Sequence, residues 1–128
     1  WEKEGLPRQT IKGCVAISGV YDLDAVLHVS VNHQIRLTPE TARRNSPLVN
    51  PPRPHAPLVI AVGGGEPEGW KQMSRDLYHR CKEQGVVCEY LEVPGANHFM
   101  LSSHLADSQS LLTQAIFKQM GRPIPART

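Results

Sequence analysis

Short apolar runs alternate with amphipathic segments along most of this chain. Three runs, at residues 13–18, 57–62 and 86–93, are short and rich in β-branched residues, as buried strands are. Over residues 70–81, apolar side chains recur at intervals of three and four, which predicts one buried face of a helix. Gly85 follows where glycine usually ends a helix. Strands that alternate with helices predict an α/β fold with a parallel sheet.

Other segments also predict helices. The residues Thr-Pro-Glu at 38–40 combine a capping residue, a proline at the first helical position and an acid in the first turn. That helix should end before Pro47. A shorter helix, capped by Asp22 or Asp24, is expected after the first strand. One long helix that ends at Gly121 is expected last, because these positions share a helical face: Leu101, Leu105, Ser108, Leu112, Ala115, Ile116 and Gln119.

Length and composition limit the classes that this chain can belong to. Its 128 residues suit a single domain or part of one. Three strands alone would leave an exposed sheet edge, and Trp1 begins what looks like mid-chain sequence, so we expect further strands upstream. The net charge of +2 is too balanced to favour a nucleic-acid or anionic-membrane partner, and no apolar run approaches a membrane span. The oligomeric state stays open between monomer and homodimer.

Cysteine usage favours a reducing compartment. The three cysteines have no metal-ligand spacing. Cys14 and Cys88 lie within apolar runs, so buried free thiols are the expectation. We therefore expect a cytoplasmic protein.

Candidate chemistry follows the second and third predicted strands. The glycines at 63–65 end the second strand and Glu66 comes next, while His98 lies beyond Pro94 and Gly95 at the end of the third. Loops at the carboxyl ends of parallel strands line the ligand crevice of open α/β sheets, so the two side chains are expected to be neighbours. A histidine can exchange a proton near neutral pH, and a carboxylate can orient its ring. Glu68 stays open as an alternative acid.

These motifs, in this order, resemble the C-terminal half of an α/β-hydrolase. Residues 13 to about 120 are most similar to the kynurenine formamidase (arylformamidase) group and the esterases close to it. The matching pieces are residues 18–23, Ser46 and Pro47, residues 62–66, and residues 97–99. The order of acid before histidine also fits the superfamily.

The resemblance implies a serine hydrolase of tryptophan catabolism that cleaves a small amide or ester, such as N-formylkynurenine to kynurenine and formate. His98 would be the general base and acid, and Glu66 the triad carboxylate. No cofactor is implied. Tyr21 and Phe99 are candidates either to flank an aromatic substrate or to pack in the core.

One departure from the family pattern is large. The nucleophile elbow G-x-S-x-G and the HGG-type stretch of the oxyanion hole are both absent. Ser18 lacks the first glycine of the elbow, so we expect it to line the pocket rather than act as nucleophile. The nucleophile is expected in an upstream half of the same fold.

Competing hypotheses use the same residues. The glycines at 63–65 suggest a phosphate cradle, but the lysine of a P-loop and the G-x-G-x-x-G spacing are both missing. The six histidines share no metal-binding pattern, so no metal is expected. Two alternatives to an arylformamidase remain, a carboxylesterase of the same fold and a non-catalytic module that keeps only the fold.

Overall fold

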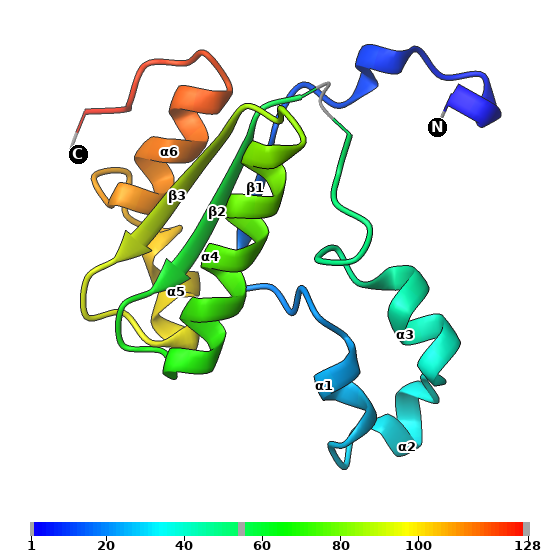
Figure 1. Ribbon diagram of the computed structural model, residues 1–128. Helices are drawn as coiled ribbons and strands as arrows, with labels where there is room; N and C mark the ends of the chain where they lie inside the picture. The colour runs from blue at the N-terminus through cyan, green and yellow to red at the C-terminus, as the bar shows by residue number, and fades with distance from the viewer. Residues whose placement is uncertain (1, 54–55, 127–128) are drawn as a thin grey trace.

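A parallel three-stranded sheet forms the centre of the computed structural model, which describes residues 2–53 and 56–126 (Figure 1). Its strands are β1 (Cys14–Ile17), β2 (Leu58–Gly63) and β3 (Cys88–Val93), in the order β1-β2-β3. All three coincide with the predicted apolar runs. The predicted α/β class, with parallel strands alternating with helices, is confirmed.

The register brings the carboxyl ends of the strands to one edge of the sheet. Ile17 of β1 is aligned with Ala61 of β2, and Gly63 of β2 is aligned with Val93 of β3. The residue after β1 is Ser18, whose N–H donates to the carbonyl of Ala61 at 2.7 Å. The chain therefore leaves all three strands at the same end of the sheet.

Helix α4 (Glu68–Glu83) covers one face of β2 and β3 with its predicted apolar stripe. It ends where expected, just before Gly85, whose φ is 75°. The core on this face consists of Tyr21, Leu58, Ile60, Leu77, Cys81, Val86 and Cys88. It anchors α4 against the sheet.

Helices α5 (His98–His104) and α6 (Leu111–Gln119) cover the opposite face. Successive strand residues point to opposite faces, so Ile60 packs toward α4 while Ala61 packs toward α5 and α6. The second core consists of Ala61, Val93, Ala96, Leu101 and Leu112. The result is three layers with β2, buried along its whole length, in the middle (Figure 1).

The prediction of one long final helix was wrong, because the chain turns between α5 and α6. The Ser110 hydroxyl accepts from the N–H of Thr113 at 3.1 Å and donates to the carbonyl of His104 at 2.6 Å. The Asp107 carboxylate accepts from the N–H of Gln109 at 2.9 Å. These side-chain bonds to the backbone replace helical bonds and make Ser110 the cap of a new helix.

Three short helices form a group set away from the sheet (Figure 1): α1 (Asp24–Leu27), α2 (Asn32–Ile35) and α3 (Pro39–Asn45). Thr38 caps α3 as predicted. Asp22 and Asp24 do not cap α1. The Asp22 carboxylate instead accepts from the N–H of Asp24, which is the first residue of the helix.

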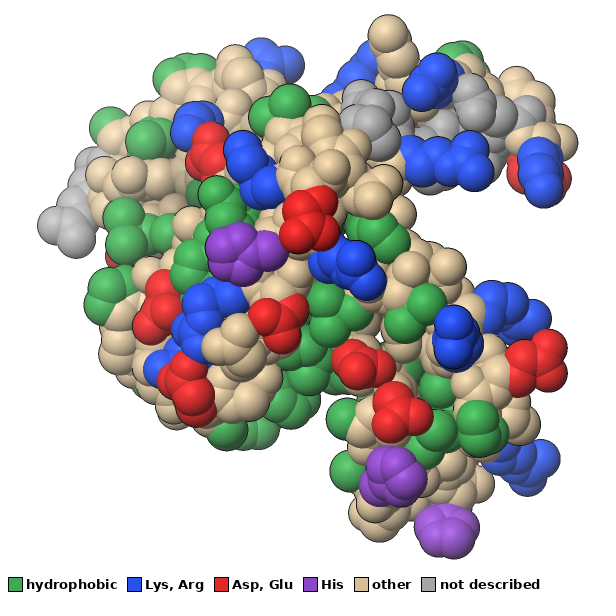
Figure 2. All heavy atoms as spheres, viewed as in Figure 1, with side chains coloured by type: hydrophobic (Ala, Val, Ile, Leu, Met, Phe, Trp, Pro, Cys, Tyr) green, Lys and Arg blue, Asp and Glu red, His purple; other side chains and the backbone are tan. Residues whose placement is uncertain are grey.

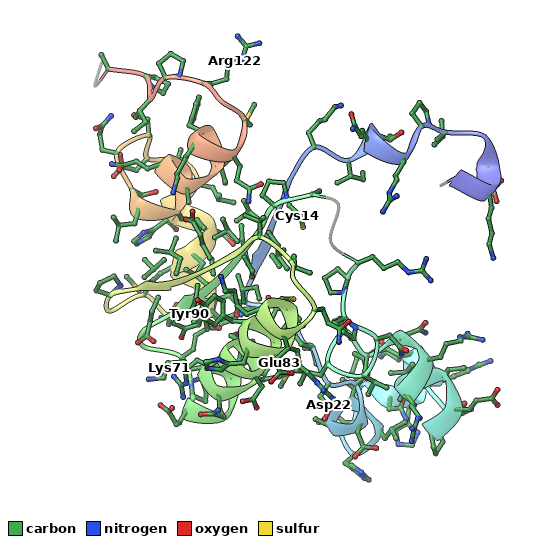
Figure 3. The ribbon with its side chains drawn as sticks, turned by 45° about the horizontal axis from the view of Figure 1, so that its top comes forward. Cys14, Asp22, Lys71, Glu83, Tyr90 and Arg122 are labelled. Atoms are coloured by element: carbon green, nitrogen blue, oxygen red, sulfur yellow. The ribbon has the colours of Figure 1, made fainter. Side chains whose placement is uncertain are left out.

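The N-terminal segment adds two short 3₁₀ helices, Glu2–Glu4 and Arg8–Thr10, and leads into β1. Cys14 begins this edge strand and is exposed, so its predicted burial was wrong (Figure 3). Cys88 is buried as expected, and burial raises the pKa of its thiol to about 12. No helix within the described residues is long and apolar enough to cross a membrane.

Charged side chains are mixed on the surface. Figure 2 shows Lys and Arg interspersed with Asp and Glu over the sheet and α4. Among the described residues, neither sign forms a broad area over these elements.

Candidate functional site

Backbone hydrogen bonds join the loops that follow β2 and β3. The N–H of Gly64 donates to the carbonyl of Val93 at 2.8 Å, and the N–H of Gly65 donates to the carbonyl of Ala96 at 2.9 Å. A Cβ atom at Gly63 would lie 2.2 Å from the Ala96 carbonyl oxygen, so only glycine fits there. The glycine run thus lets the loop carrying Glu66 approach the loop that leads to His98.

Glu66 is a buried carboxylate whose oxygens both have donors. Its Oε2 accepts from the N–H of Gly63 at 2.7 Å, within the turn that its own N–H closes onto the Gly63 carbonyl. Its Oε1 accepts from the Ser18 hydroxyl and lies 3.0 Å from Nδ1 of His98. Only 1% of the side chain is exposed, so these bonds replace solvation by water.

The hydrogen bonds keep Glu66 ionised. Burial by itself would raise the pKa of this carboxyl group. The hydrogen bonds from Ser18, Gly63 and His98, together with the charge of His98, outweigh burial and hold the pKa below its ordinary value of 4.5. At neutral pH the site therefore holds a carboxylate.

His98 begins α5, and the side of its ring that faces away from Glu66 is open to solvent. Asn97 caps the helix by accepting from the N–H of Met100 at 2.9 Å, which fixes the backbone next to His98. The imidazole is 54% exposed, and within the described residues Nε2 has no hydrogen-bond partner. The rings of Trp70 and Phe99 meet it edge-on, with centroids 5.9 and 5.7 Å away.

Electrostatics select one tautomer of His98. An ionised carboxylate can only accept hydrogen bonds, so the hydrogen of the neutral imidazole is most favourably placed on Nδ1, facing Glu66. The opposite tautomer would set the Nδ1 lone pair against Oε1 at 3.0 Å. Nε2 is then left as an accessible base.

The structure brings Glu66, and not Glu68, to His98. The Glu68 side chain is 69% exposed and forms ion pairs with Lys71, at 3.0 Å, and with Arg75. Both partners lie on α4, so Glu68 belongs to the surface of that helix.

Two residues of this site make contacts that were not predicted. Ser18 was expected to line a pocket, and its Oγ lies 2.8 Å from Nδ1 of His98. Trp70 was expected only in the apolar stripe of its helix, and its indole N–H also donates to the Ser18 carbonyl at 3.2 Å. The signal for Ser18 was its place at the end of a strand, which Glu66 and His98 share.

The two aromatic candidates differ in position. Phe99 adjoins His98 and is 83% exposed, so it is available to a ligand. Tyr21 is 5% exposed and packs in the core beside α4, with its hydroxyl 3.4 Å from the Ala16 carbonyl. Only Phe99 is exposed beside the site.

The glycine run is not available as a phosphate cradle. The N–H groups of Gly63, Gly64 and Gly65 are already bound to Glu66, Val93 and Ala96. No group of three or more His, Cys, Asp or Glu side chains among the described residues is arranged to hold a metal ion.

Comparisons with known proteins find similarity to hydrolases. No protein-family model matches the chain. It is 31% identical over 128 residues to kynurenine formamidase of Salmo salar, covering 95% of this chain and 43% of that protein. It is 28% identical over 117 residues to kynurenine formamidase of Danio rerio, covering 88% of this chain and 40% of that protein. The chain thus spans about two fifths of the length of these relatives.

A solved structure shows the same partial match. A candidate thioesterase from Silicibacter sp. TM1040 superposes with a TM-score of 0.72 at 26% identity, over 88% of this chain and 42% of that one. The chain is thus similar to kynurenine formamidases, and its three parallel strands with their helices match part of a hydrolase-like α/β fold.

Proposed function

We propose that this chain supplies the histidine and the acid of a serine hydrolase that cleaves a small amide or ester. The leading candidate for its substrate is a formamide such as N-formylkynurenine. The observation that supports this most is the 3.0 Å contact between His98 Nδ1 and Glu66 Oε1, with Nε2 left accessible. The relatives' name supplies the substrate class.

In this proposal His98 moves the protons of the reaction. Its Nε2 takes the proton of a serine hydroxyl as that serine attacks the carbonyl carbon, and Glu66 stabilises the imidazolium that forms. The imidazolium then protonates the leaving amine or alcohol. A water molecule, deprotonated by the same nitrogen, releases the acyl group from the serine.

The nucleophile and the oxyanion hole are proposed to lie in the part of the relatives that this chain does not span. The sequence has no G-x-S-x-G motif, and the chain covers 43% of the Salmo salar protein. That remaining part is the proposed partner of this chain, and it would complete the substrate pocket around His98 and Phe99.

A second candidate is hydrolysis of a thioester by the same residues. The 26% identity and TM-score of 0.72 to the candidate thioesterase favour it. The mechanism is unchanged apart from the leaving group, so relative rates on three substrates separate the candidates.

The test compares wild type with His98→Ala in the longest polypeptide that the gene encodes. Substrates are N-formylkynurenine, 4-nitrophenyl acetate and an acetyl thioester. We expect the variant to lose about a thousandfold or more in kcat/KM. The control is His79→Ala, which removes an exposed histidine on α4 and should retain wild-type rates.

Two results would overturn the proposal. One is near-normal turnover by His98→Ala, and the other is a wild-type protein that hydrolyses none of the three substrates. Faster turnover of the thioester than of both other substrates would instead select the second candidate. A fluorophosphonate probe should label a serine outside these 128 residues.

A further inference from the structure

We propose that Ser18 is a positioning residue of this site, whose hydroxyl holds the Glu66 carboxylate and thereby keeps His98 in the form that carries its hydrogen on Nδ1. This inference rests on the proposed function for its catalytic consequence, but its geometric part can be measured without turnover.

Ser18, Glu66 and His98 share two hydrogens among three polar atoms. Ser18 Oγ, Glu66 Oε1 and His98 Nδ1 form a triangle in which each atom lies within hydrogen-bonding distance of the other two. Only two hydrogens are available, one on the hydroxyl and one on Nδ1, and the carboxylate can only accept. Both hydrogens therefore point to Oε1. Ser18 supplies a donor that the buried carboxylate would otherwise lack.

The backbone of Ser18 is strained. Its φ is 46°, in the left-handed region, which costs a residue other than glycine about 1 kcal/mol or more. Two bonds hold this conformation, from the Ser18 N–H to Ala61 at 2.7 Å and from the Trp70 indole to the Ser18 carbonyl at 3.2 Å. Glycine would relieve the strain but has no hydroxyl. The strained conformation therefore serves to direct the side chain at Glu66.

The position of Ser18 differs from that of a triad nucleophile. In a triad the nucleophile bonds to the ring nitrogen that faces away from the acid. Ser18 instead lies 2.8 Å from Nδ1, the nitrogen that faces Glu66, and it is only 5% exposed. Its proton is directed to the carboxylate and not to Nε2. The serine that Nε2 activates to attack a substrate carbonyl would therefore be a different residue.

The proposal is tested in the longest polypeptide that the gene encodes, with Ser18→Ala and Ser18→Gly. The matched control is Ser74→Ala, which removes a fully buried hydroxyl that donates to the Trp70 carbonyl at 3.0 Å and has no other hydrogen bond among the described residues. Trp70→Phe keeps a ring beside His98 and removes the N–H that holds Ser18.

Two NMR measurements report positioning directly. The ¹⁵N shifts of the His98 ring give the fraction of each tautomer, and the ¹³C shift of the Glu66 carboxyl follows its ionisation. The titratable groups around Glu66 are His98 on α5 and Tyr21 after β1, and burial raises the pKa of Tyr21, so that phenol stays neutral in acid. In both Ser18 variants we expect the Glu66 midpoint to rise and the Nδ1–H tautomer to lose population.

The kinetic expectation separates positioning from folding. Loss of one hydrogen bond to a charged group should lower kcat about ten- to a hundredfold with little change in KM. Ser18→Gly should lose as much kcat as Ser18→Ala although it relieves the strain, while Ser74→Ala keeps both NMR signatures. Trp70→Phe should move in the same direction by less.

Unchanged tautomer populations and an unchanged Glu66 midpoint in Ser18→Ala would overturn the proposal. So would a fluorophosphonate label on Ser18, since that residue would then be the nucleophile. If wild type hydrolyses nothing while the NMR signatures still move in the Ser18 variants, the proposed function fails and the positioning role stands.

Discussion

Replacing Glu66 with glutamine tests the centre of the site, because it removes a charge while keeping nearly the same shape. Three donors converge on this side chain: the Ser18 hydroxyl, Nδ1–H of His98 and the Gly63 N–H. A carboxylate accepts all three with its two oxygens. An amide has one acceptor oxygen and an NH₂ group that must face another donor.

Both orientations of the amide are unfavourable. If its oxygen faces Gly63, its NH₂ faces Ser18 and His98, and the imidazole must accept at Nδ1 and carry its hydrogen on Nε2, where it cannot act as a base. If its oxygen faces His98, the NH₂ opposes the Gly63 N–H, which a buried site cannot solvate. A buried donor without a partner costs about 1–3 kcal/mol. We expect the free energy of unfolding to fall by that amount at pH 7.

We expect kcat/KM of Glu66→Gln to fall by about 10²- to 10⁴-fold, since the wrong tautomer removes the base. Steady-state kinetics and urea unfolding measure the two effects separately. The matched control is Glu68→Gln, whose exposed side chain makes two surface ion pairs. That variant should stay within about twofold in rate and leave the urea midpoint nearly unchanged. Full activity in Glu66→Gln would refute the reasoning.

The same substitution tests how the stability of the site depends on pH. The pKa of Glu66 is held below its ordinary value of 4.5 in the folded state, so the unfolded state binds a proton at higher pH than the folded state. The stabilisation is complete above the unfolded pKa and is lost as pH falls through the folded one. The stability of wild type minus that of Glu66→Gln should therefore shrink as pH falls below about 5. A difference that grows toward acid would reverse the sign.

Two further substitutions test the framework of the site. Gly63→Ala sets a Cβ 2.2 Å from the Ala96 carbonyl, so we expect about 1–3 kcal/mol of destabilisation and at least a tenfold loss of kcat, whereas Gly69→Ala, in open space on α4, should leave kcat unchanged. Equal kcat in the two variants would contradict the close approach. Ile60→Ala removes a fully buried side chain from β2 and should cost about 2–5 kcal/mol in urea unfolding, against about 0.5 kcal/mol or less for Val87→Ala, which is 71% exposed.

The pairing of Glu66 with His98 could be predicted because it depends on strand periodicity and on the direction of parallel strands. Both residues follow apolar runs that end in glycine or proline, and parallel strands release the chain at one edge of the sheet. The choice between Glu66 and Glu68 could be made only once the turn from Gly63 to Glu66 was known. Glu66 folds its carboxylate back onto the N–H of Gly63, whereas Glu68 pairs with cations on α4.

Other features depend on contacts that a sequence pattern does not contain. Apolar spacing continues through Leu105 to Leu112, but the Ser110 cap and the Asp107 turn end one helix and begin another. Cys14 has the apolar neighbours of a buried residue, yet it begins an edge strand and is exposed. The break between the helices follows from local hydrogen bonds, and the exposure of Cys14 follows from its place at the edge of the sheet.

The position of β1 indicates where a nucleophile would have to come from. In the described sheet β1 is an edge strand, with β2 on one side and no strand on the other. A parallel strand added at that edge would run about 5 Å from β1, and its carboxyl end would lie next to Ser18. Ser18, Glu66 and His98 already follow the carboxyl ends of β1, β2 and β3. A serine in the exit loop of the added strand would share this edge of the sheet with the accessible Nε2 of His98, while Ser18 lies on the Nδ1 side of the ring, bonded to Glu66. Because the Ser18 hydroxyl bonds to Glu66, Nε2 of His98 is left free to act as base for a serine from the neighbouring strand.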